Sequence, residues 1–156
     1  MDTLVIGIGN RYRGDDGAGP KVVDALRAAA MPSVETRLEP GEGAGLMEAW
    51  HGVERVFLVD AVVAGKRPGT VYRIDAHRER VPQDFFKYST HAFSLAEAVE
   101  MARVLGELPP VLVIYGIEGG DFSAGDGLST AVESAVDDVT RRIAEDITGQ
   151  TGGGDA

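Results

Sequence analysis

The sequence LVIGIGNRYRGDDGAGP, residues 4–20, leads from an apolar run through a glycine-rich turn to a proline. The run from Leu4 to Ile8 is short and almost wholly apolar, which is typical of a buried strand. Pro20 suits the first turn of a helix, since its fixed φ is helical and its missing N–H needs no partner there. The stretch therefore predicts a strand, a tight turn and a helix in succession.

A glycine-rich turn between a strand and a helix usually binds phosphate, but this turn lacks the residues that phosphate binding needs. Tyr12 stands where the dinucleotide fingerprint requires its third glycine. A P-loop would continue after Gly14 with Lys and then Ser or Thr, whereas this chain has Asp15 and Asp16. Because adjacent carboxylates repel a phosphate, the turn favours a cation or a peptide as ligand.

The composition limits the classes of protein to consider. The chain has 156 residues, which is about one domain with a substantial core. Its net charge of −10 disfavours nucleic acid and anionic membranes as partners. It has no cysteine, which excludes disulfides, thiolate metal sites and cysteine nucleophiles. With no signal peptide and no run long enough to span a bilayer, we expect a cytoplasmic protein.

Apolar runs alternate with helical periodicity along the rest of the chain. Further strands are expected at residues 34–38, 56–59, 70–74 and 111–115. Helices are expected at residues 20–30, 46–50, 94–105 and 132–143. A turn at residues 41–45 precedes the second helix, and a capping box of Ser94 and Glu97 begins the third, which reaches Leu105.

This alternation predicts an α/β fold with three layers, in which helices cover both faces of a mostly parallel, twisted sheet of about five strands. The strand at residues 70–74 follows Pro68 and Gly69, which indicates an edge strand or one arm of a hairpin. We expect one domain over residues 1–147 and a disordered tail over 148–156, which is small and polar.

The candidate ligand site lies at the carboxyl ends of the strands, where open α/β sheets bind their ligands. Asp15 and Asp16 follow the first strand, and we expect one of them to cap the next helix while the other faces the site. Asp60 directly follows the apolar run 56–59, and its alternative role is to cap a turn. The segment Gly116–Glu118 follows the strand at 111–115.

One of the three histidines is a candidate member of the same site. His91 precedes the capping box, where a ring nitrogen can face a cleft, whereas we expect His51 and His77 to be exposed. With Asp16 and Asp60 it would form an open site for nickel, zinc or manganese, or a general acid–base trio without metal. No G-x-S-x-G pattern occurs, which disfavours a serine hydrolase.

Four motifs in order resemble those of the hydrogenase maturation endopeptidases, which process the large subunit of nickel–iron hydrogenases. The resemblance covers residues 4–145. The motifs are Gly7–Asn10 with Asp15–Gly19, then Val59–Val62, then Ser89–His91, then Gly116–Glu118 with Gly127–Ser129.

The resemblance implies that Asp16, Asp60 and His91 are the catalytic and metal-contacting residues, and that the fold is an α/β sheet flanked by helices. It also implies an aspartic-type endopeptidase that holds no permanent cofactor. Nickel carried by the large-subunit precursor would be recognised, and a C-terminal extension would then be removed. Many members have Glu at the position of Asp16, whose side chain is one methylene shorter.

The residues leave two other functions open. The first is a non-proteolytic metal-binding or chaperone module in hydrogenase assembly. The second is a metal-dependent hydrolase that acts on a small molecule.

Overall fold

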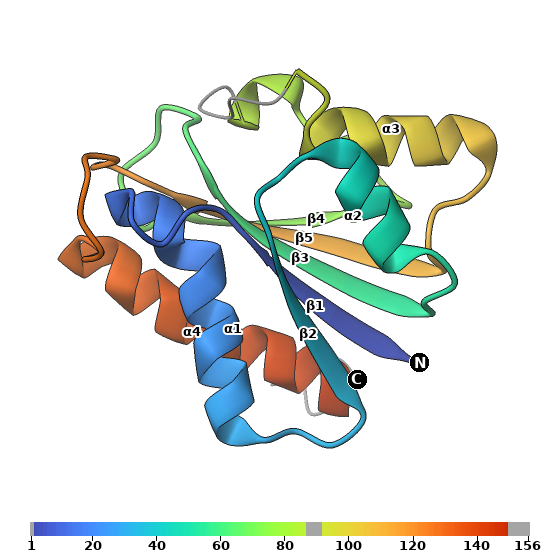
Figure 1. Cartoon of the computed structure of the whole chain (residues 1–156), viewed down its shortest axis with the longest axis horizontal. Helices are drawn as coiled ribbons and strands as arrows, with labels where there is room; N and C mark the ends of the chain where they lie inside the picture. The colour runs from blue at the N-terminus through green and yellow to red at the C-terminus, as the bar shows by residue number, and fades with distance from the viewer. Residues whose placement is uncertain (1, 87–91, 150–156) are drawn as a thin grey trace.

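The computed structural model describes residues 2–86 and 92–149, and it confirms the predicted α/β architecture. Its five strands form one sheet in the order β2-β1-β3-β5-β4 (Figure 1). The strands are β1 (Thr3–Ile8), β2 (Val34–Glu39), β3 (Arg55–Val62), β4 (Val71–Asp75) and β5 (Val111–Glu118). Four of them are parallel, and β4 lies antiparallel at one edge, as its flanking Pro68 and Gly69 predict.

Helices cover both faces of this sheet, which gives the three predicted layers (Figure 1). The α-helices are α1 (Ala18–Ala29), α2 (Gly43–Trp50), α3 (Leu95–Leu105) and α4 (Thr130–Thr148), and the 3-10 helices are η1 (Gly14–Gly17) and η2 (Gln83–Phe86). In the part of the chain that the structure describes, no helix is long and apolar enough to cross a membrane.

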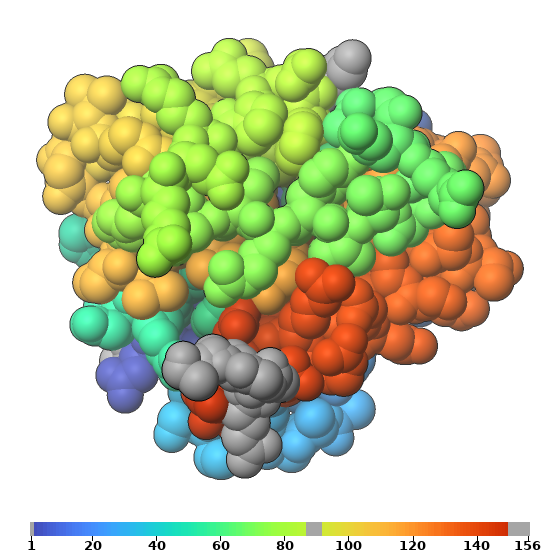
Figure 2. All heavy atoms as spheres, turned by 180° about the vertical axis from the view of Figure 1, so that it is seen from behind, coloured from blue at the N-terminus to red at the C-terminus, as the bar shows by residue number. Residues whose placement is uncertain are grey.

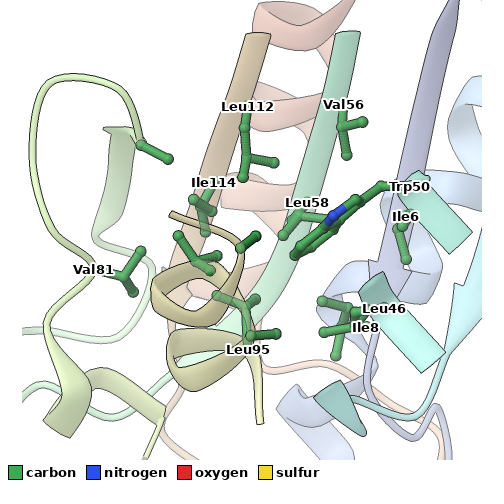
Figure 3. Packing of buried hydrophobic residues seen from close by; sticks show 14 of the residues in the cluster. Ile6, Ile8, Leu46, Trp50, Val56, Leu58, Val81, Leu95, Leu112 and Ile114 are labelled. Carbon is green, nitrogen blue, oxygen red and sulfur yellow. The ribbon is translucent and has the colours of Figure 1, made fainter. Parts of the chain in front are cut away.

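Two apolar cores lie on opposite sides of the sheet, and β3 contributes to both of them. Its side chains alternate, so Val56 and Leu58 face α2 and α3, while Phe57 and Val59 face α1 and α4. Figure 3 shows the first core, which includes Trp50 of α2 and Leu58 of β3. A central parallel strand is buried on both faces, which explains why the run 56–59 is continuously apolar.

Local side-chain contacts move some boundaries away from the predicted ones. Helix α2 begins at Gly43 and not at Leu46, because the Glu42 carboxylate accepts hydrogen bonds from the Ala44 and Gly45 amides at 3.1 and 2.9 Å. The predicted turn at 41–45 is therefore largely helical.

Two predictions about helix ends are wrong. Helix α1 starts before Pro20 and ends at Ala29. Ala29 and Ala30 are predicted to lie on its buried apolar face, but both are exposed. Helix α4 reaches Thr148 and ends on the left-handed Gly149, so the predicted tail does not begin at residue 148. The rest of that predicted tail lies outside the described residues, as do Ser89, Thr90 and His91.

Candidate active site

A cavity of about 490 Å³ opens at the carboxyl edge of the sheet, and both predicted acids line it. Asp16 comes from η1 and Asp60 from β3, so the structure brings together two of the three predicted site residues. His91 lies outside the described residues, but Phe86 and Ser94, on either side of residues 87–91, also line the cavity.

Asp16 is held by the turn that follows β1. Its Oδ2 accepts a hydrogen bond of 2.8 Å from the Asn10 amide, and Asn10 Oδ1 accepts one of 2.9 Å from the Tyr12 amide. Gly9 has a φ of +134°, and a Cβ there would collide with the Asp16 carbonyl oxygen. Only glycine therefore allows the turn to fold this closely around Asp16.

Asp60 lies inside β3 and not at its end, which corrects the predicted strand boundary. The strand continues to Val62 because residues 60–62 pair with Gly116–Glu118 of β5. Pairing on a central strand fixes the backbone of Asp60, so the direction of its carboxylate is set by the sheet and not by a loop.

The environment of the cavity raises the pKa of both carboxyls. Burial raises the pKa of Asp60 well above its usual value, the charge of Asp16 raises it further, and the Ala61 amide opposes the change. Burial also raises the pKa of Asp16, against the opposing effects of the Asn10 amide and Arg13. Two such carboxyls in one cavity are typical of acid–base or metal-binding sites.

Asp15 has a different role from Asp16, and the prediction that one of the pair caps the helix is wrong. Asp15 is fully buried, and its carboxylate accepts hydrogen bonds from the amides of Gly120, Asp121 and Ser129 at 2.8–3.0 Å. The Ser129 hydroxyl donates to it as well, at 3.0 and 3.1 Å to its two oxygens. Asp15 thus fastens the first turn to the loop between β5 and α4, which we call the closing loop (residues 119–129).

Backbone hydrogen bonds strengthen this connection. The Asp15 amide donates to the Asp121 carbonyl and the Gly14 amide to the Gly125 carbonyl, both at 2.8 Å. The Gly125 amide in turn donates to the backbone carbonyl of Tyr12 at 2.9 Å. Gly14 has a φ of +58°, and a Cβ there would collide with the Asp121 carbonyl. The segment that presents Asp16 is therefore supported on one side by its own turn and on the other by the closing loop.

Glu118, at the end of β5, is a buried structural acid. It accepts hydrogen bonds from the Ala64 and Gly65 amides and, at 2.8 Å, from the Tyr72 hydroxyl. Burial raises the pKa of Tyr72 to about 12, with Glu118 contributing. Figure 2 shows the segment after β3 (green) against the closing loop (orange). The Gly69 amide, in that segment, donates to the backbone carbonyl of Glu118 at the end of β5. Glu118 therefore orders the segment after β3.

The other two histidines do not line the cavity. His51 is exposed at the end of α2, as predicted. His77 is also exposed, although its Nε2 lies 2.7 Å from the Pro109 carbonyl oxygen. Among residues 2–86 and 92–149, no three His, Cys, Asp or Glu side chains form a group that could hold a metal ion. The described part of the chain therefore places two carboxyls, Asp16 and Asp60, at the cavity.

Two half-buried acids line one cavity at the carboxyl edge of the sheet, and comparison with known proteins identifies the family. A profile of the hydrogenase maturation protease family matches residues 22–146, and the chain belongs to this family. It is therefore a peptidase of hydrogenase maturation, as the motifs predict, which favours this function over the two alternatives.

The chain is similar in sequence to a putative hydrogenase maturation protease of Methanocaldococcus jannaschii, with 31% identity over 94% of this chain and 96% of the relative. It is 29% identical to the hydrogenase 2 maturation protease of Escherichia coli, over 92% and 88% of the two chains. The solved structure of the hydrogenase maturating endopeptidase HybD from E. coli has a TM-score of 0.74 over 96% and 94%, at 22% identity, which supports the fold.

The raised pKa of Asp60 predicts that the site lowers the stability of the fold. The folded state holds a proton on Asp60 at pH values where the unfolded chain has lost it, so the free energy of unfolding falls as the pH rises through this window. Asp60→Asn removes this loss of unfolding free energy, because asparagine does not titrate. A difference of one pKa unit between the folded and unfolded states is equivalent to about 1.4 kcal/mol of stability.

We therefore expect Asp60→Asn to be more stable than the wild type, by a margin that is larger at a pH well above the ordinary pKa of an aspartate than at a pH near it. Urea denaturation at both pH values measures this margin, with Asp126→Asn as the control at an exposed carboxylate. A margin that does not change with pH would contradict the prediction.

Proposed function

We propose that this peptidase removes a C-terminal extension from the nickel-loaded precursor of a nickel–iron hydrogenase large subunit. The observation that carries the proposal is the convergence of Asp16 and Asp60 on one cavity in a chain of this family. The precursor is the partner, and neither nucleic acid nor a membrane is needed for the reaction. We place the reaction in the cytoplasm.

Nickel in this proposal belongs to the substrate, and the enzyme keeps no permanent cofactor. Asp16, Asp60 and His91 contact the metal, since carboxylate oxygen and imidazole nitrogen are suitable ligands for nickel. Phe86 and Ser94 support a place for His91 here, because they flank its segment and line the cavity.

The raised pKa values of the two acids suit a site that responds to a metal brought by the substrate. Without a cation, burial and mutual repulsion favour a proton on one of the carboxyls. A divalent ion in the cavity favours both ionised forms, so metal binding and proton release are coupled. Nickel presented by the precursor would therefore favour the ionised pair, which couples the charge of the site to metal insertion.

The direct test is to incubate the enzyme with nickel-loaded and nickel-free precursor and to measure the intact mass of the large subunit. We expect a C-terminal fragment to be lost from the nickel-loaded precursor alone. Equal cleavage of both forms would show that the enzyme does not use nickel to recognise its substrate. Tight binding to the nickel-loaded form without any cleavage would favour the chaperone function.

A further inference from the structure

Strand β2 has one side of its backbone free. It lies at the end of the sheet, with β1 on one side and no strand beyond it within residues 2–86 and 92–149 (Figure 1). The Gly9 amide donates to the Glu39 carbonyl at 3.1 Å, which fixes the direction of the backbone groups. Because these groups alternate along a strand, residues 35, 37 and 39 face β1, whereas Thr36 and Leu38 point outward.

The free groups of β2 lie beside the candidate active site. Outside the β1–β2 ladder, no backbone hydrogen bond among the described residues engages the Leu38 N–H or C=O. Leu38 also lines the cavity that contains Asp16 and Asp60, and so do Pro40 and Gly41, which follow β2. An extended peptide paired with β2 would lie about 4.8 Å from it and would continue directly into this cavity.

We propose that the outer edge of β2 binds the C-terminal extension of the precursor as an additional strand and guides it toward Asp16 and Asp60. The inference rests on the proposed function, in which the substrate segment is a chain end. An extended chain end can supply the N–H and C=O groups that an open sheet edge lacks. The continuity of this edge with the cavity is the reason to assign it to the substrate.

The rim of the cavity offers apolar contacts to the same peptide. Leu38 is 42% exposed and Tyr12 is 65% exposed, and both line the cavity. Main-chain pairing would supply affinity, and these side chains would select among peptide side chains. A second copy of this chain is a weaker candidate, because each copy carries a net charge of −10 and the two repel each other.

The test compares Leu38→Pro with Leu38→Ala. Proline removes the outward N–H, and an edge strand tolerates it because that group makes no bond to β1. Alanine removes the side chain and keeps the N–H. We expect Leu38→Pro to raise the KM for nickel-loaded precursor about tenfold, with a much smaller change in kcat, because about one hydrogen bond to the substrate is lost. Leu38→Ala should raise the KM less.

Amide hydrogen exchange on the wild type gives a second test that needs no variant. Adding nickel-loaded precursor should slow the exchange of the Thr36 and Leu38 amides at least about tenfold, because both become paired. Circular dichroism checks that Leu38→Pro is folded. If it is not, or if no cleavage occurs, the exchange rates alone test whether the precursor pairs with β2.

The outcomes separate the docking inference from the proposed function. If the wild type cleaves the precursor but Leu38→Pro has an unchanged KM, the docking inference is wrong and the function stands. If the wild type does not cleave nickel-loaded precursor, the function is wrong, and unprotected amides would then overturn the docking as well. If Leu38→Pro converts a dimer to a monomer in sedimentation while KM is unchanged, the edge binds a second copy instead.

Discussion

Asp60→Asn is expected to abolish removal of the C-terminal extension while the protein remains folded. Asparagine keeps the shape of the side chain and an oxygen that can accept a hydrogen bond from Ala61. It removes the negative charge that a metal or a water-activating base requires. We expect processing to fall by at least about 10²-fold.

The measurement is the accumulation of uncleaved, nickel-loaded precursor, followed by intact mass over time. His51→Ala and His77→Ala serve as controls, since both side chains are exposed and lie outside the cavity, and both variants should process at the wild-type rate. Wild-type processing by Asp60→Asn would show that Asp60 is a structural residue. The unfolding experiment on the same variant checks that any loss of processing is not a loss of fold.

Asp15→Ala is expected to have the largest effect on stability. It leaves three part-buried amide N–H groups and the Ser129 hydroxyl without their acceptor, and it disconnects the first turn from the closing loop. An unsatisfied buried donor costs about 1–3 kcal/mol, so we expect a loss of at least about 3 kcal/mol in the free energy of unfolding. Processing should fall as well, because Asp16 is the next residue.

Asp121→Ala is the matched control for Asp15→Ala. Its carboxylate is exposed and bonds only to Ser123, within the closing loop itself. Urea denaturation should show a loss of no more than about 1 kcal/mol for this variant. Similar losses for the two variants would mean that the buried carboxylate contributes little to the connection.

The layers of the fold and the two acids of the site could be predicted from the sequence because each depends on local pattern. The apolar run 56–59 predicts a strand buried on both faces, and the general rule for parallel sheets then places Asp16 and Asp60 at one edge. The structure confirms that these two acids share a cavity. The catalytic and metal-contacting roles of Asp16, Asp60 and His91 remain predictions.

The roles of Asp15 and Glu118 could not be predicted, because their partners are distant in sequence. Asp15 and Asp16 are identical neighbours, and only the position of the closing loop distinguishes a buried connector from a site residue. Glu118 lies at a strand end where a site residue is expected, yet the Ala64 and Gly65 amides and Tyr72 occupy its oxygens. Counting these hydrogen bonds requires the tertiary structure.

The connection between the first turn and the closing loop also has a consequence for biosynthesis. The hydrogen bonds of Asp15 join positions that are 105, 106 and 114 residues apart. A ribosome makes Asp16 early, but the contacts that hold its segment cannot form until Ser129 has been made. Contacts of such long range form late, because a large loop must close first. The segment that presents Asp16 can therefore take its final position only after most of the chain has been synthesised.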